Sequence, residues 1–146
     1  MNIIYATSEA QITACYPVYQ FLRPHLREAD FALRVQRQQL EGFRLIFVTE
    51  GVSVVAAAGF RILEFLAFGK VLYSDDLIAD PQKRGAGYGG ALMDWLHAHA
   101  RENGCDELHL DSGYQRADAH RLYLNQGLHL CCHHFSMKIN KDVTAD

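Results

Sequence analysis

The stretch that decides the fold runs from Leu77 to Gly90 and reads LIADPQKRGAGYGG. Its first three residues are apolar, as at the end of a buried strand, and from Gly87 to Glu102 apolar residues recur at helical spacing. Glycine has no Cβ, so the glycines between these two elements let a ligand approach the backbone closely. The first N–H groups of a helix are unpaired and carry partial positive charge, and Lys83 and Arg84 add two full charges beside them. The stretch therefore predicts a strand, a turn and a helix start that together bind an anion such as pyrophosphate.

Three kinds of phosphate-binding turn compete for this stretch, besides a tight loop without a ligand. A P-loop ends in Gly-Lys-Ser/Thr, and residues 89–91 read Gly-Gly-Ala, which excludes it. The dinucleotide fingerprint G-x-G-x-x-G is met by residues 85–90, and Asp111 stands near where a ribose-binding acid would fall. In that fold, however, the strand runs directly into the first glycine, whereas residues 80–84 intervene here. The sequence that remains after Asp111 is also too short for a doubly wound sheet.

The third kind is the acyl-CoA turn of the GCN5-related N-acetyltransferases (GNAT), which this stretch resembles. Their signature R/Q-x-x-G-x-G/A is matched by Arg84, Gly87 and Gly89. A second motif of the family, A-x-x-L-Y-x-x-x-G-F, is similar to residues 119–128, which read AHRLYLNQGL. The chain departs from the family in two places, with Arg116 where an Asn is frequent and a Leu in place of the final Phe.

The resemblance implies a GNAT fold: an α/β (α+β) protein with a mixed, mostly antiparallel sheet flanked by helices, in the order β-α-α-β-β-β-α-β-α-β-β. It also implies acetyl-CoA as the co-substrate. Backbone groups of residues 77–79 would hold its pantetheine arm and polarise the thioester carbonyl, at a place where the sheet splays open. The residues implied to bind the cofactor are Leu77, Ile78, Ala79, Arg84, Gly85, Ala86, Gly87, Tyr88, Gly89 and Gly90.

Local patterns predict the elements of this order within one domain, residues 1–146. The strands expected are 3–6, 43–50, 53–63, 70–79, 107–112, 128–132 and 135–139. The helices expected run from a capping box at Ser8 and Gln11 to Leu22, and over 28–40, 87–102 and 118–126. Within the second helix, Phe31, Val35 and Leu40 are expected to face the core.

Tyr123 occupies, by the same resemblance, the position that in many GNAT enzymes protonates the departing thiolate. A phenol suits this role because its proton can pass to sulfur over a short distance. The alternative is a helix tyrosine that packs against the sheet.

Asp75 and Asp76 are adjacent acids inside an otherwise apolar strand, where a carboxylate is costly unless it is hydrogen-bonded or used. On a regular strand they point to opposite faces, so at most one can aim at the reacting centre. The pair resembles the Glu-Asp pair of polyamine and aminosugar-phosphate acetyltransferases, in which the first acid is the candidate base. Asp75 is therefore expected to be the catalytic base or an amine anchor, and Asp76 to be structural or to border the substrate. A salt bridge between Asp75 and Arg61 is the alternative.

Two histidines are candidates for binding the acceptor amine. His120 precedes Tyr123 by about one helical turn. His25 lies between the first two helices, in a loop that helps to form the acceptor pocket of GNAT enzymes. The other histidines and the four cysteines show no zinc-ligand spacing, so no metal is expected.

Composition and charge limit the classes of molecule that the protein is expected to bind. The net charge of -3 offers no basic surface for nucleic acid and favours a small cationic amine as the acceptor. No signal peptide or long apolar run appears and the cysteines are irregularly placed, which predicts a cytoplasmic protein that does not bind membranes. Exposed edges of the two closing strands would allow a homodimer. The expected function is thus direct transfer of the acetyl group of acetyl-CoA to a primary amine; the alternative is a non-catalytic acyl-CoA-binding regulatory module.

Overall fold

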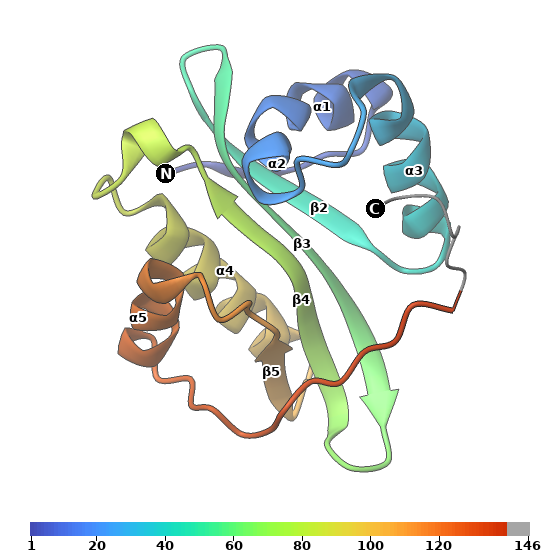
Figure 1. Cartoon of the computed structure of the whole chain (residues 1–146), viewed down its shortest axis with the longest axis vertical. Coiled ribbons are helices and arrows are strands. Elements are labelled where there is room, and N and C mark those ends of the chain that lie inside the picture. Colours follow the sequence, from blue (N-terminus) through green and yellow to red (C-terminus); the bar gives the residue numbers. More distant parts are fainter. Residues whose placement is uncertain (140–146) are drawn as a thin grey trace.

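A five-stranded sheet in the order β1-β2-β3-β4-β5 forms the centre of the computed structural model, which describes residues 1–139 (Figure 1). Consecutive strands from β1 to β4 are antiparallel, whereas β5 is parallel to β4. The strands are β1 (Ile3–Tyr5), β2 (Arg44–Glu50), β3 (Ser53–Phe65), β4 (Gly69–Ala79) and β5 (Glu107–Leu110). The mixed, mostly antiparallel sheet predicted from the sequence is confirmed.

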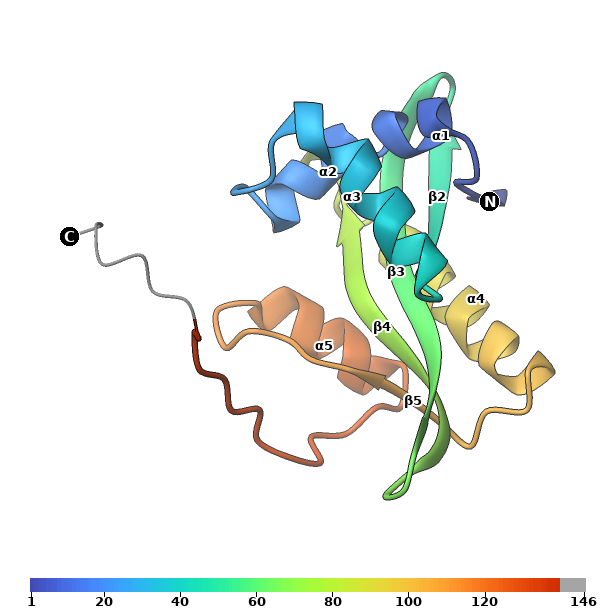
Figure 2. The ribbon, with the colours of Figure 1, turned by 90° about the vertical axis from the view of Figure 1, so that its right-hand side faces the viewer.

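Helices cover both faces of this sheet. They are α1 (Glu9–Ala14), α2 (Tyr16–Leu22), α3 (Glu28–Leu40), the 3₁₀ turn η1 (Pro81–Lys83), α4 (Tyr88–Glu102) and α5 (Ala117–Asn125). The first three helices pack against Leu45 and Phe47 on one face, and α4 packs against Ile46 and Val48 on the other. Successive side chains of a strand point to opposite faces, so β2 supplies both cores. In Figure 2, α2 and α4 lie on opposite sides of the strands.

The first predicted helix is two helices in the structure. Its capping box is confirmed, because Ser8 and Gln11 exchange side-chain and backbone hydrogen bonds. The helix then ends at Ala14, and α2 begins at Tyr16 with Pro17 in its first turn. Proline lacks an N–H donor and its ring collides with the preceding turn of a helix, so the chain restarts here instead of continuing.

The helix α3 has the predicted bounds, but one of its predicted core residues is wrong. Phe31 and Val35 are buried, whereas Leu40 is 90% exposed. Five residues turn a helix by about 140° beyond one full revolution, so Leu40 lies well away from the stripe that contains Val35.

The two closing strands predicted over 128–132 and 135–139 are also wrong. The structure has no strand in residues 128–139, and Leu130 and Phe135 are about nine-tenths exposed. An alternating apolar pattern gives a segment strand propensity, but a strand forms only when an edge pairs with it. The edges on which the expected homodimer depended are therefore missing from the described part of the chain.

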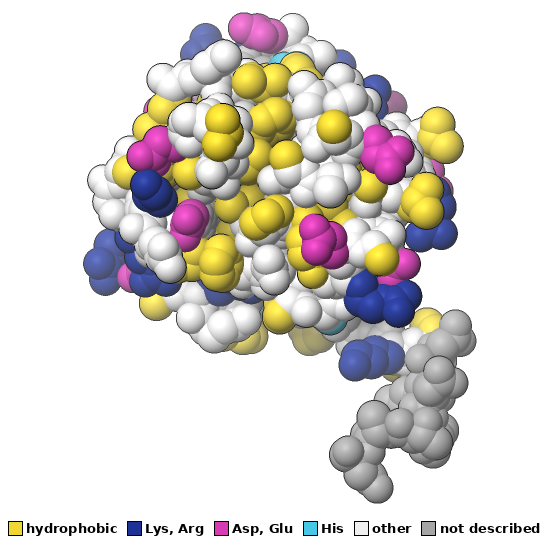
Figure 3. Space-filling model, turned by 90° about the horizontal axis from the view of Figure 1, so that it is seen from above, with side chains coloured by type: hydrophobic (Ala, Val, Ile, Leu, Met, Phe, Trp, Pro, Cys, Tyr) yellow, Lys and Arg dark blue, Asp and Glu magenta, His cyan; other side chains and the backbone are white. Residues whose placement is uncertain are grey.

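No helix within residues 1–139 is long and apolar enough to cross a membrane. The end of the molecule seen from above in Figure 3 carries hydrophobic side chains across its middle, with acidic and basic side chains interspersed around them.

Candidate functional site

A groove of about 990 Å³ opens where β4 and β5 part, and it gathers most of the residues singled out from the sequence. The glycine turn and the start of α4 line one part of it. Asp75 and Asp76 of β4 line another part, together with Leu22 at the end of α2. The helix α5 contributes Tyr123 to the wall.

The glycine turn has the backbone geometry expected of an anion cradle. Gly85 and Gly87 have φ values of 83° and 82°, in the left-handed region that residues with a side chain rarely adopt. Gly87 is also the N-cap of α4, and no side chain hydrogen-bonds the start of that helix. The first N–H groups of α4 are therefore left for an anion to bind.

The two cations of the turn are paired with acids. Lys83 lies 3.0 Å from Glu50, and Arg84 lies 3.1 Å from Asp118 of α5. Both side chains of the second pair are 73% exposed, and such surface pairs contribute little to stability. Lys83 and Arg84 can therefore exchange these partners for a bound anion at small cost.

The edge of β4 that faces the groove is unpaired at its C-terminal end. The strand β5 pairs with Val71 to Ser74 only, while β3 pairs with β4 along its other edge as far as Ala79. Among the described residues no strand covers the β5 side of residues 75–79, which is the opening expected from the sequence. Backbone groups on that edge must bind water or a ligand.

Gly89 allows α5 to approach the start of α4. A Cβ built on Gly89 would lie 3.0 Å from the Cδ2 atom of Leu122, tighter than an ordinary contact. This glycine therefore brings the helix that carries Tyr123 against the turn.

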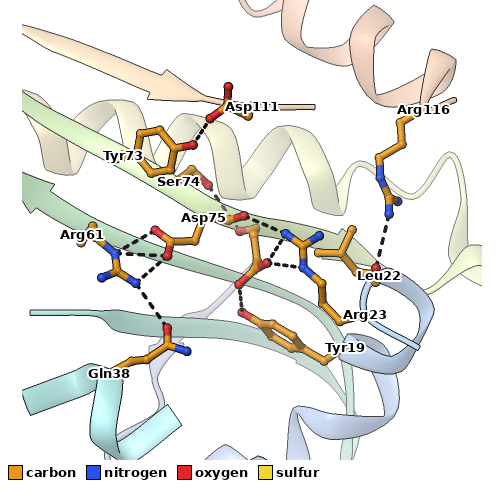
Figure 4. Close-up of polar contacts among 11 residues, drawn as sticks. Tyr19, Leu22, Arg23, Gln38, Arg61, Tyr73, Ser74, Asp75, Asp111 and Arg116 are labelled. Atoms are coloured by element: carbon orange, nitrogen blue, oxygen red, sulfur yellow. Dashed lines mark hydrogen bonds and ion pairs between the residues drawn. The ribbon is translucent and has the colours of Figure 1, made fainter. Parts of the chain in front are cut away.

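Asp75 and Asp76 project from the same face of the sheet, so the prediction of opposite faces is wrong. In the pairing of β3 with β4, Gly59 lies opposite Asp76 and Phe60 opposite Ser74, which leaves Asp75 as an extra residue. Such a bulge interrupts the two-residue alternation and redirects a side chain. Both carboxylates consequently lie on the side of α2 and α3, Asp75 beside Arg61 (Figure 4) and Asp76 beside Arg23.

Asp75 forms the salt bridge that the sequence left as an alternative. Nε of Arg61 lies 3.1 Å from each carboxylate oxygen, and Nη2 lies 2.6 Å from Oδ2. Arg61 also donates a hydrogen bond to Gln38 of α3 at 3.2 Å. A bidentate pair of this kind fixes the orientation of both side chains and satisfies the carboxylate (Figure 4).

Asp76 is the more deeply buried acid and is bound by Arg23, which follows α2. Arg23 Nη2 lies 2.7 Å from Oδ1, and the hydroxyl of Tyr19 lies 3.5 Å from Oδ2, at the outer limit of a hydrogen bond. Burial raises the pKa of Asp76, and the adjacent Arg23 opposes that rise. A buried carboxylate with a raised pKa has the character of a general base.

Tyr123 is held in the groove wall by α5, with its ring packed beside the α4 core. Burial raises the pKa of its phenol, and the charge of Arg116 partly opposes that rise. The side chain is consequently protonated at neutral pH, as a proton donor must be.

Three groove residues were not predicted as site residues. Arg116, the N-cap of α5, donates a hydrogen bond of 3.3 Å to the carbonyl oxygen of Leu22. Arg121 lines the groove from the same helix, and the Oγ atom of Ser112 is buried there without a hydrogen-bond partner in the described structure. The departure from the family motif at Arg116 was a usable signal, whereas nothing in the sequence singles out Ser112.

The two histidine candidates do not line the groove. His25 is exposed in the connection between α2 and α3. His120 lies 2.9 Å from the carbonyl oxygen of Gly113 through Nε2. Residues 1–139 contain no group of three or more His, Cys, Asp or Glu side chains placed to hold a metal ion.

The sequence matches the family model described as Acetyltransferase (GNAT) family over residues 8–128. The chain is 31% identical over 121 residues to the uncharacterized N-acetyltransferase YhdJ of Bacillus subtilis, a match that covers 82% of this chain and 85% of that protein. It is 36% identical over 52 residues to the aminoalkylphosphonate N-acetyltransferase of Salmonella typhimurium, covering 36% of this chain and 34% of that protein.

The fold is similar to that of known structures. A transcriptional regulator from Bacillus halodurans superposes with a TM-score of 0.83 at 21% identity, covering 94% of this chain and 99% of the other. At this level of identity the likeness shows the fold.

Proposed function

Because the chain belongs to the GNAT family of acetyltransferases, we propose that it transfers the acetyl group of acetyl-CoA directly to the primary amine of a small molecule. One observation carries this proposal. A single groove joins an anion cradle at the start of α4 to a pair of partly buried carboxylates on β4, and Tyr123 of α5 lines its wall. The candidate cofactor cradle, the candidate base and the candidate acid thus border one cavity, which supports a direct transfer.

The glycine turn would hold the cofactor. The free N–H groups of α4 and the glycine backbone suit the pyrophosphate, with Lys83 and Arg84 as neighbouring charges. Arg121, which has no acidic partner among the described ion pairs, is a further candidate for a phosphate. The unpaired edge of β4 at residues 77–79 suits the amide groups of the pantetheine arm.

The contacts favour Asp76 over Asp75 as the base. Both oxygens of Asp75 are occupied by Arg61, whereas Asp76 has a pKa raised by burial. In this mechanism Asp76 accepts a proton from the ammonium of the acceptor through water, and the free amine attacks the thioester carbonyl. The C–N bond forms, the C–S bond breaks, and Tyr123 donates its proton to the departing thiolate. The second proton lost by the attacking nitrogen then passes through water to Tyr123 and restores its phenol.

A thiol-release assay with acetyl-CoA and a panel of amines tests the proposal. The panel includes putrescine, for the small cationic amine favoured by the sequence, and 2-aminoethylphosphonate, because one relative is named for aminoalkylphosphonates. We expect turnover with at least one amine and a sequential kinetic pattern. Ping-pong kinetics, or an acetylated enzyme trapped without acceptor, would exclude direct transfer.

The alternative is the non-catalytic acyl-CoA-binding module. Calorimetry and the thiol-release assay together separate the two functions. The module would bind CoA normally in calorimetry but would release no thiol with any amine of the panel.

A further inference from the structure

The two strand acids of the groove are already compensated by arginines. Asp75 pairs with Arg61 at 2.6 Å and Asp76 pairs with Arg23 at 2.7 Å. A purely cationic acceptor would therefore find no unpaired carboxylate on β4. The preference for such an acceptor, which rested on the strand acids and the overall charge, loses much of its support.

Arg116 is a surplus positive charge beside these pairs. It is partly buried, lines the groove, and takes part in none of the ion pairs formed within residues 1–139. A guanidinium carries five N–H donors, and the bond to Leu22 uses one of them. The remaining donors form a planar fork that matches a carboxylate, phosphonate or phosphate.

Arg116 lies in the same groove as Asp76 and Tyr123, the proposed base and acid. Figure 4 shows its side chain reaching from α5 to the end of α2, next to Arg23. Its charge acts on Tyr123, which lines the same groove. An anion bound by Arg116 would therefore lie at the acceptor side of the groove.

We propose that the acceptor carries an anionic group a few bonds from its amine, and that Arg116 binds that group and so orients the amine toward Asp76. This inference rests on the proposed function. The acceptor class is then amino acids and aminophosphonates or aminophosphates, which share an ammonium group and an oxyanion.

Two other roles for Arg116 are separable from this one. It could fasten α5 to α2 through Leu22, or it could act only on the phenol of Tyr123. Either role would affect every acceptor equally, whereas an anion site affects only acceptors that carry the anion.

Matched acceptors test the inference. β-Alanine and β-alaninamide differ only in whether the group beside the amine is charged, and 2-aminoethylphosphonate and ethylamine form a second pair. We expect the anionic member of a pair to have the higher kcat/KM in thiol release. Arg116→Gln should lower that value by about 30-fold for the anionic acceptors and by no more than about threefold for the neutral ones, the loss expected for one charged hydrogen bond.

Two further variants complete the experiment. Arg116→Lys keeps the charge without the fork and should recover part of the loss, and it replaces Arg116→Gln if that variant fails to fold. Arg34→Gln makes the same change at an exposed residue of α3 outside the groove and should leave both acceptors unaffected. An equal loss for anionic and neutral acceptors, or no loss for either, would overturn the inference while leaving the acetyltransferase activity intact.

Binding provides a readout that does not need turnover. Calorimetry with the CoA-bound protein should detect 2-aminoethylphosphonate in the unmodified protein and weaker binding in Arg116→Gln. If no amine is acetylated, the proposed function is wrong. The anion site is then supported if Arg116→Gln binds 2-aminoethylphosphonate more weakly, and overturned if it binds equally well.

Discussion

Arg23 binds Asp76 through two nitrogen atoms that share one carboxylate oxygen, with Nη2 2.7 Å and Nε 2.9 Å from Oδ1. The same guanidinium donates a hydrogen bond of 3.2 Å to the backbone oxygen of Asp75. The residue after α2 is thus joined to the bulge of β4. This contact connects the helices on one side of the groove to the strand that carries both acids.

Arg23→Gln should move the pH dependence of the reaction. Burial raises the pKa of Asp76 and Arg23 opposes the rise, so removing the cation should raise this pKa further. A base works only when deprotonated, so the acidic limb of the kcat/KM profile should shift to higher pH. Arg27→Gln, which changes an exposed arginine paired with Asp30, is the control and should not move the limb. A limb that stays in place in Arg23→Gln would contradict a role for Asp76 in that limb.

Asp76→Asn and Asp75→Asn separate the two candidate bases. If Asp76 is the base, its amide variant should lose about 10²-fold in kcat. Asp75→Asn should lose less, because its contacts are those of an ion pair with Arg61. Thermal unfolding of both variants controls for the loss of each pair. The reverse order of effects would support the assignment to Asp75 that the sequence favoured.

Tyr123→Phe should lower kcat by about 10²-fold while CoA binding survives, because the change removes one hydroxyl group from a packed ring. Single-turnover thiol release measures the effect, and calorimetry with CoA is the control. An unchanged rate would mean that Tyr123 only packs between α5 and the sheet.

Gly59→Ala should destabilise the protein, because the bulge places this glycine under an aromatic ring. A Cβ built on Gly59 would lie 2.3 Å from Cζ of Phe43, whose ring is buried, and 3.0 Å from the hydroxyl of Tyr19. We expect a loss of about 1–3 kcal/mol in the free energy of unfolding, measured by urea denaturation.

The same substitution at Gly90 is the control for stability. A Cβ there has no neighbour nearer than 3.7 Å, and alanine has the higher helix propensity, so Gly90→Ala should unfold at the same or a higher urea concentration. Equal midpoints for Gly59→Ala and the unmodified protein would show that Phe43 can move aside.

Local features of the chain were predictable from the sequence. The capping box at Ser8, the bounds of α3 and the glycine turn depend on residues within a few positions of one another, and all appear in the structure. The two failures have different causes. Leu40 lies off the helical stripe that contains Val35, and residues 128–139 have strand propensity but no partner edge, which propensity cannot supply.

The sequence by itself determined the family, the glycine turn and the candidacy of Asp75, Asp76 and Tyr123, because these depend on short motifs. Only the tertiary structure decided how these side chains are placed. The common direction of the two carboxylates depends on how β4 pairs with β3, and the bond between Arg116 and Leu22 joins residues 94 positions apart. Register and long-range contacts arise from packing, which no short stretch of sequence contains.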